Sequence, residues 1–149
     1  MNYHYGRRHM RRIAIVIDSL AGGGAEKVML TLSTELLRLG HQVTIFSLKL
    51  TLHYDLPAGI NIVHPFAKRT KSLRGLFNRA ELAAIFYKAY QYEESQNGRF
   101  NLTLVNLYQS YKVASACELS NPYYIIHNSY KQELKREKYL GPLKYLENK

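Results

Sequence analysis

One stretch, from Arg11 to Lys49, constrains most strongly what this chain can fold into. It begins with the apolar run Ile13–Ile17, which is too short for a helix and rich in β-branched residues. Such a run is typical of a strand that is buried on both faces of a parallel sheet. A second run of this kind, Val43–Phe46, closes the stretch. Two parallel strands need a crossover, so the stretch predicts a right-handed βαβ unit.

The residues between the two strands predict a helix that follows a glycine turn. Gly40 suits the helix C-terminus because glycine readily takes a positive φ. Glu26 lies in the first turn, where a carboxylate is favourable toward the helix dipole. The face expected to pack on the sheet has apolar residues spaced three and four apart: Val28, Leu32, Leu36 and Leu39.

The turn before this helix is a candidate binding site. Ligands of open parallel sheets bind beyond the carboxyl ends of the strands, and a helix N-terminus offers unpaired N–H groups and a partial positive charge. The alternative is that the glycines only form a tight turn, although one glycine would usually suffice for that. The residues at this position are Asp18, Ser19, Gly22, Gly23 and Gly24.

Further strands and helices alternate along the rest of the chain. Strands are expected at Ile60–His64, Phe100–Leu107 and Tyr123–Ile126, and helices at Leu76–Gln96 and Ser110–Leu119. The pattern predicts an α/β, three-layer, Rossmann-like domain with a mainly parallel sheet. The strand ends at Asp18, Asn106 and His127 are expected to cluster along one edge of that sheet.

Length and composition predict one domain, over residues 11–149, after a disordered basic extension at residues 1–10. Cys117 is the single cysteine, so an internal disulfide is excluded and a reducing compartment is expected. Its expected role is that of a small core residue. No apolar stretch approaches the roughly 20 residues of a membrane span. A cytoplasmic location is therefore expected.

Several blocks of the sequence resemble the N-terminal domain of family 4 glycosyltransferases of the GT-B fold. The most specific are Gly22–Val28 (GGGAEKV) and Gly40–Thr44 (GHQVT). Those enzymes typically have Gly-Gly-Ala-Glu-(Arg/Lys)-Val at a helix start and Gly-His-(Glu/Gln)-Val-Thr at a strand start. Phe100–Leu102 and Tyr124–Asn128 follow in the same order, so the resemblance covers about residues 11–130.

The resemblance implies roles for individual residues. The glycine loop (Gly22, Gly23 and Gly24) would meet the donor diphosphate or the acceptor through its backbone N–H groups. His127 would be the catalytic histidine that contacts the donor sugar; a histidine that merely closes a strand is the alternative. Asp18 and Ser19 would touch the acceptor, although Asp18 equally suits a cap of the glycine turn. Asn128 is a weaker candidate for binding.

One departure from the family limits this interpretation. GT-B enzymes have a second Rossmann-like domain that holds the donor nucleotide, and the sequence through Lys149 does not contain it. The expected partners are thus a nucleotide sugar, a glycan or lipid-linked acceptor, and a donor domain supplied in cis or in trans. The chain alone is expected to be inactive, and its acceptor domain incomplete. The alternatives are a non-catalytic acceptor-binding subunit of a split, two-chain enzyme and a nonfunctional fragment.

The formal net charge of +10 suggests a further partner. Basic residues gather at Lys68, Arg69, Lys71 and Arg74, ahead of an apolar helical stripe. A basic rim beside such a stripe suits the surface of an anionic membrane, as in family members that glycosylate lipids. The alternative is that the stripe packs on the sheet while the charges face water. The stripe consists of Leu73, Leu76, Phe77, Ala80, Ala84 and Tyr87.

Other binding chemistries fit less well. A dinucleotide fingerprint would need a glycine where Lys27 lies, and the Gly-Lys-Ser/Thr of a P-loop is absent. The six histidines are scattered, so neither a metal site nor a cofactor is expected, with the nucleotide sugar acting as a substrate. Tyrosines near basic residues would suit single-stranded nucleic acid, but no binding-module motif is present. A nucleic-acid partner is therefore not expected.

Overall fold

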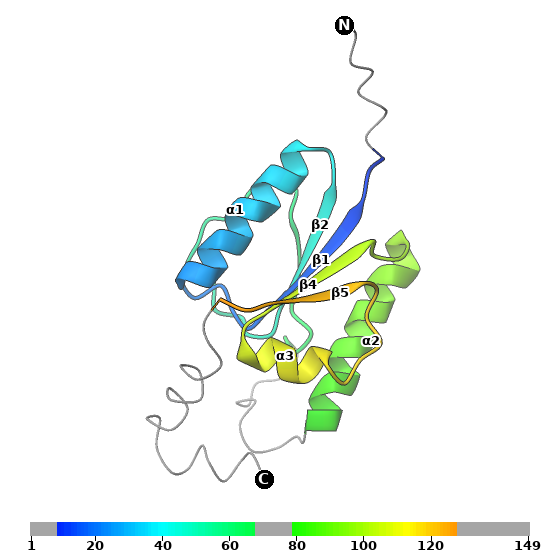
Figure 1. Ribbon diagram of the computed structural model, residues 1–149. Coiled ribbons are helices and arrows are strands. Elements are labelled where there is room, and N and C mark those ends of the chain that lie inside the picture. The colour runs from blue at the N-terminus through cyan, green and yellow to red at the C-terminus, as the bar shows by residue number, and fades with distance from the viewer. Residues whose placement is uncertain (1–8, 68–78, 128–149) are drawn as a thin grey trace, which may run out of the picture.

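A five-stranded parallel sheet in the order β3-β2-β1-β4-β5 organises the protein (Figure 1). The computed structural model describes residues 9–67 and 79–127. The strands are β1 (Arg12–Ile17), β2 (Gln42–Ser47), β3 (Asn61–Val63), β4 (Leu102–Asn106) and β5 (Pro122–Ile125). The helices are α1 (Gly24–Arg38), α2 (Arg79–Asn97) and α3 (Tyr108–Ala114). The predicted α/β, Rossmann-like, three-layer fold is confirmed, and every strand pairing is parallel.

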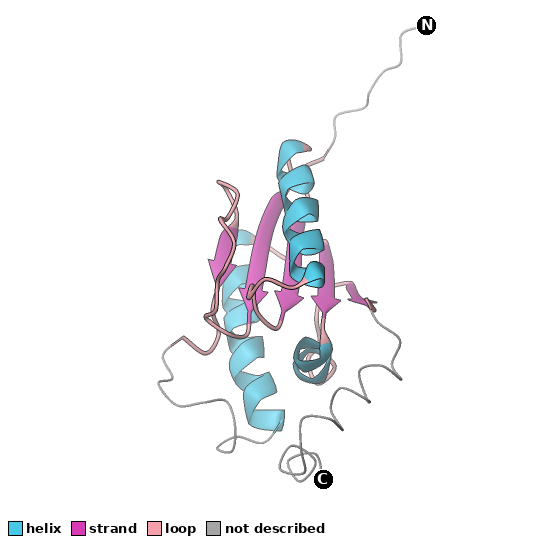
Figure 2. Cartoon of the chain, turned by 90° about the vertical axis from the view of Figure 1, so that its left-hand side faces the viewer, coloured by secondary structure: helices cyan, strands magenta, loops and turns pink. Residues whose placement is uncertain are grey.

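The helices lie on both sides of the sheet. Helix α1 covers one face, and α2 and α3 lie on the other (Figure 1). Figure 2 shows the strand arrows pointing toward the same end of the molecule, where α3 lies beyond the arrowheads. The carboxyl edge of the sheet is therefore the edge that α3 borders.

Strand β1 is the centre of the core, and all six of its residues are buried. Ile15 and Ile17 pack on the α1 side, whereas Ala14 and Val16 pack on the side of α2 and α3. The apolar run that the sequence presents at Ile13–Ile17 thus fills both layers, as predicted for a strand in a parallel sheet.

An aromatic cluster joins α2 to the sheet. The Phe46 ring lies 5.7 Å from that of Phe86, 5.4 Å from that of Tyr90 and 5.9 Å from that of Phe100, measured between centroids. The Tyr90 hydroxyl lies 2.7 Å from Oγ1 of Thr103, so this buried phenol has a hydrogen-bond partner. Burial raises the pKa of Tyr90, opposed mainly by this hydrogen bond.

The apolar face predicted for α1 is partly wrong. Val28 is 54% exposed, whereas Met29, Leu30 and Ser33 are buried and Leu36 is only partly so. Apolar residues surround more of this helix than one face, so their spacing alone did not identify the buried side. The loop after β2 also packs against the α1 side of the core, through residues such as Leu56 and Ile60.

Of the described residues in the stripe expected on the second long helix, only Tyr87 packs against the core. Ala80 and Ala84 are exposed, and the residues of α2 that are buried are Ala83, Phe86 and Tyr90. The large aromatic side chains determine the packing, because they bury far more apolar surface than alanine does. The stripe residues before residue 79, like residues 1–8, lie outside the described residues.

Element boundaries agree in most places. Gly40 has φ 85°, as expected for the residue after a helix end, and Glu26 lies in the first turn of α1. The helix predicted at Ser110–Leu119 is displaced, because α3 begins at Tyr108 and ends at Ala114. Cys117 is accordingly not helical but lies in the turn after α3, half-buried against the core.

Candidate functional site

At the carboxyl edge of the sheet, the chain connections change direction between β1 and β4. Strand β1 lies between β2 and β4, and the register pairs Ile17 with both Ser47 and Asn106. The chain leaves β1 toward α1 on one face and leaves β4 toward α3 on the other. This reversal of direction is where open α/β sheets bind ligands.

The glycine loop lies exposed at this edge. Gly22 has φ 104°, a conformation that residues with a side chain rarely adopt. Gly23 is the N-cap of α1 and has extended backbone angles. A Cβ atom at Gly24 would meet nothing within 4 Å, so the first helical residue faces open space. The loop therefore leaves the backbone at the start of α1 accessible.

A second loop, after β2, braces the glycine loop. The Leu20 N–H donates to the Thr51 carbonyl at 3.1 Å, and the His53 N–H donates to the Leu20 carbonyl at 2.8 Å. The Tyr54 hydroxyl donates to the Gly23 carbonyl at 3.0 Å. A Cβ atom at Gly22 would lie 3.6 Å from His53 Nδ1, so this exposed imidazole borders the loop. Sequence reasoning missed His53, and only tertiary structure brings it to the site.

The Glu26 side chain turns back toward the N-terminus of α1. A Cβ atom at Gly23 would lie 2.2 Å from Glu26 Oε2, so the carboxylate lies against the glycine Cα. Glu26 is also among the buried residues of α1. Its negative charge is favourable toward the helix dipole, as predicted, and it lies where an anionic ligand of the helix N-terminus would bind.

Asp18 holds the start of α3 rather than capping the glycine turn. Its carboxylate accepts hydrogen bonds from the Ser110 N–H (2.7 Å), the Ser110 hydroxyl (2.7 Å) and the Gln109 N–H (3.1 Å). Leu107, the N-cap of α3, has φ 71° and turns the chain into this arrangement. Burial raises the pKa of Asp18, while the bonds from Ser110 and Gln109 and the charge of Lys49 oppose that shift. These contacts indicate a structural carboxylate.

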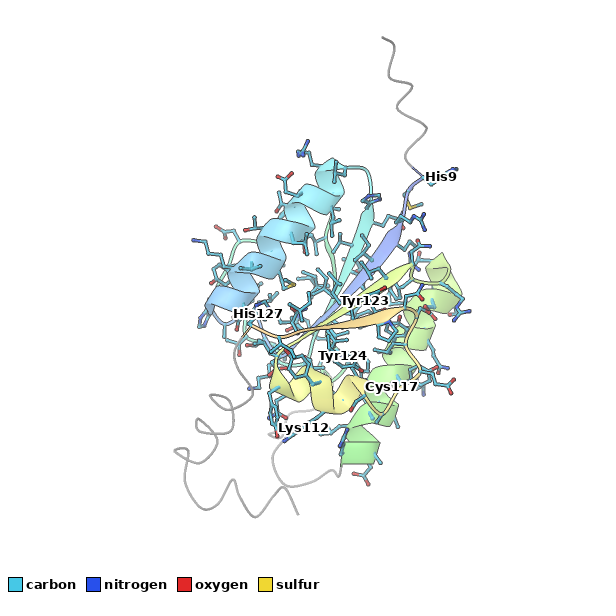
Figure 3. All side chains as sticks on the ribbon, viewed as in Figure 1. His9, Lys112, Cys117, Tyr123, Tyr124 and His127 are labelled. Atoms are coloured by element: carbon cyan, nitrogen blue, oxygen red, sulfur yellow. The ribbon has the colours of Figure 1, made fainter. Side chains whose placement is uncertain are left out.

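His127 follows β5 and contacts the end of β4. Its Nε2 atom lies 3.0 Å from Oδ1 of the buried Asn106. Figure 3 shows His127 beyond the end of β5, at the carboxyl edge of the sheet. The expected grouping of Asp18, Asn106 and His127 along one edge is confirmed, but the contacts join Asp18 to α3 and Asn106 to His127.

The remaining predicted residues are placed less favourably or lie elsewhere. Ser19 is buried, with 8% of its surface exposed, so it offers little to a ligand. Asn128 and the basic residues Lys68, Arg69, Lys71 and Arg74 lie outside the described residues.

Other reactive chemistry is limited in the described part of the chain. Burial raises the pKa of the Cys117 thiol to about 11, which makes it a poor nucleophile at neutral pH. Among residues 9–67 and 79–127, no three or more His, Cys, Asp or Glu side chains form a group able to hold a metal ion. Within the same ranges, no helix combines the length and apolar character needed to cross a bilayer.

The carboxyl edge thus combines an accessible glycine loop at a helix N-terminus with two imidazoles, those of His53 and His127. Backbone N–H groups and imidazole nitrogens are suited to hydrogen-bonding a hydroxyl-rich or anionic ligand. In comparisons with known proteins, no family model and no curated protein matches the sequence. The functional assignment therefore depends on this geometry and on the resemblance in sequence.

Proposed function

We propose that this chain is the acceptor-side part of a glycosyltransferase that transfers a sugar from a nucleotide-sugar donor to a glycan or lipid-linked acceptor. The observation that carries the proposal is the exposed glycine loop at the carboxyl edge of the sheet, the edge at which His127 follows β5. The GGGAEKV block that carries the resemblance forms the loop and the first turn of α1.

Electrostatics favour an acceptor hydroxyl over a diphosphate at the glycine loop. The Glu26 carboxylate lies against Gly23, at the end of α1 where an anion would otherwise be stabilised. A second negative charge beside it would be repelled, whereas a neutral hydroxyl would still find N–H donors and the carboxylate as an acceptor. We assign the donor diphosphate to a second domain, in the same chain or in a separate one.

Within this proposal, His127 contacts the sugar that is transferred. The half-buried imidazole is held at the end of β5 by Asn106, so its position is fixed without a ligand. Fixed hydrogen-bonding groups cost little reorganisation when a substrate binds. Asp18 has no direct role, since its oxygens are engaged by α3.

We also propose that the protein works on the cytoplasmic side of an anionic membrane. The described residues include nine Lys or Arg and eight Asp or Glu, which leaves a formal charge of +1. The whole sequence has 21 basic and 11 acidic residues, so the remaining twelve basic and three acidic residues carry +9. The charge is thus concentrated outside the described fold, in segments that include Lys68, Arg69, Lys71 and Arg74. Such basic segments are attracted to anionic lipid.

The acceptor role is tested by titrating the isotopically labelled chain with methyl glycosides and, separately, with uridine diphosphate. Glycosides are expected to bind with millimolar affinity, shifting the amide resonances of Gly22–Gly24 as acceptor analogues and the ring resonances of His127 as analogues of the transferred sugar. Uridine diphosphate is expected to leave Gly22–Gly24 unshifted. Shifts at this loop with the diphosphate alone would instead assign it to the donor, and no response to either ligand class would overturn the proposed site.

A matched pair of variants sharpens the titration. Gly24→Gln puts a side chain into open space at the first helical residue and adds no charge beside Glu26, so the fold should be retained. It is expected to weaken the glycoside response at least tenfold by blocking approach to the backbone. Glu35→Asp, on the exposed surface of the same helix, is the control and should leave the response unchanged. Gly23→Asp is less informative because the new side chain would meet Glu26.

A further inference from the structure

The hydrogen bond between Asn106 and His127 determines which ring nitrogen carries the proton. Asn106 is fully buried, and its Oδ1 atom lies 3.0 Å from His127 Nε2. Its Nδ2 atom donates to the Leu104 carbonyl at 3.4 Å. The reverse orientation of the amide would set Oδ1 against the Leu104 carbonyl, two acceptors facing each other, so this bond favours the observed orientation.

An amide oxygen can only accept a hydrogen bond, so the nitrogen that faces it must be the one that carries hydrogen. The neutral His127 ring therefore has its proton on Nε2, and Nδ1 keeps a lone pair. Among the described residues, Nδ1 has no hydrogen-bond partner, and the side chain is only partly buried. The unprotonated nitrogen is thus the one left for a ligand.

We propose that Asn106 is a positioning residue that holds His127 in the Nε2–H tautomer, so that Nδ1 accepts a hydrogen bond from a hydroxyl of the bound sugar. The ligand step rests on the proposed function, whereas the tautomer does not. A neutral amide at position 106 also avoids the effect of a carboxylate, which would favour the imidazolium form. An imidazolium has no lone pair with which to accept a hydroxyl proton.

The tautomer is measured directly in the full chain. Long-range nitrogen–proton correlation spectra of the labelled protein, recorded where the ring is neutral, are expected to show a protonated Nε2 and an unprotonated Nδ1. This measurement needs no substitution, so it does not depend on whether a variant folds. A protonated Nδ1 in the neutral ring, or a mixture of the two tautomers, would overturn the inference.

Two variants test whether Asn106 is the cause. Asn106→Asp places a carboxylate beside Nε2 and is expected to favour the imidazolium form of His127, seen as a change in both ring nitrogen resonances. Asn106→Ala removes the acceptor and is expected to give a mixture of tautomers. Unchanged ring nitrogen resonances of His127 in both folded variants would contradict the positioning role.

The ligand step has a separate readout. Titration with a methyl glycoside is expected to shift the Nδ1 resonance of His127 more than that of Nε2. If the predicted tautomer is observed but no glycoside response is seen, the role of Asn106 stands, and the ligand step is overturned together with the proposed function. A glycoside response on a ring with the opposite tautomer would overturn the role of Asn106 and leave the proposed function standing.

Discussion

Asp18 shows how a polar residue at a binding edge can serve the fold instead of a ligand. The sequence places it at the end of β1, where ligands of such sheets bind. The structure instead directs both of its oxygens toward Gln109 and Ser110. Helices begin with N–H groups that lack a partner within the helix, and Asp18 supplies an acceptor from 92 residues away. The carboxylate thus connects β1 to α3.

Asp18→Ala is expected to lower the free energy of unfolding by about 1–3 kcal/mol, because two N–H groups and a hydroxyl lose their acceptor. The effect should depend on pH. Because burial raises the pKa of Asp18 above 3.8, the folded state binds this proton more tightly than the unfolded chain does. The contribution of Asp18 to stability is therefore largest below that value and declines as the pH rises through the folded pKa.

Urea unfolding at several values between about pH 3 and about pH 7, a range that starts below the ordinary pKa of Asp, measures this prediction. The destabilisation by Asp18→Ala should be greater at the acidic end than at neutral pH. Asp55→Ala, in an exposed loop, is the control and should change neither the stability nor its slope appreciably. If the destabilisation by Asp18→Ala grew with rising pH, the assigned direction of the Asp18 pKa shift would be wrong.

At the scale of elements, the strands were easier to predict than the faces of the helices. The residues of β1 are buried on both faces, so an apolar run alone identifies the strand. A helix buries only part of its surface, and apolar residues outside that part, such as Val28, obscure the pattern. The start of α3 could not be predicted locally, because it depends on Asp18 and on the positive φ of Leu107.

The start of α1 offers a matched pair of glycines with opposite expected effects. Gly24→Ala should raise the free energy of unfolding by up to about 1 kcal/mol, because its side chain meets open space and alanine favours the helix. Gly23→Ala should lower it by about 1 kcal/mol, because alanine is a poor N-cap and its Cβ displaces the Glu26 carboxylate. Thermal and urea unfolding of the two variants measure the difference.

The double variant Gly23→Ala with Glu26→Ala isolates the contact. If the carboxylate packs on Gly23, the cost of Gly23→Ala should be smaller when Glu26 is already absent. Equal costs in both backgrounds would mean that only the N-cap preference matters. If the Gly24→Ala variant were less stable than the original protein, the first helical residue would not be free of contacts.

At the scale of the whole molecule, topology predicted which strand ends lie together at the candidate site but not which residues contact each other. Parallel strands place their carboxyl ends at one edge, so Asp18, Asn106 and His127 were expected together. The brace from His53 and Tyr54, the fold-back of Glu26 and the bond from Asn106 to His127 depend on loop conformation. Sequence periodicity carries no information on such contacts, because loops have no regular repeat.

The distribution of charge gives a prediction for the entire chain. Because the described fold carries only +1, most of the attraction to anionic lipid should come from the remaining segments. Lys68→Glu, Arg69→Glu and Lys71→Glu together should weaken binding to vesicles of phosphatidylglycerol and phosphatidylcholine by about 100-fold or more, since each basic residue near the surface contributes about 1 kcal/mol. Binding to phosphatidylcholine alone should be weak for every variant.

The matched control changes the net charge equally without touching that segment. Lys27→Glu, Arg38→Glu and Lys88→Glu reverse three exposed charges on α1 and α2, which lie on opposite sides of the sheet. If the segment itself binds lipid, the control should lose much less affinity than the 68/69/71 variant, and added salt should weaken binding of the original protein. Equal losses in both variants would mean that only the net charge matters, and the membrane-surface assignment of Lys68, Arg69 and Lys71 would be wrong.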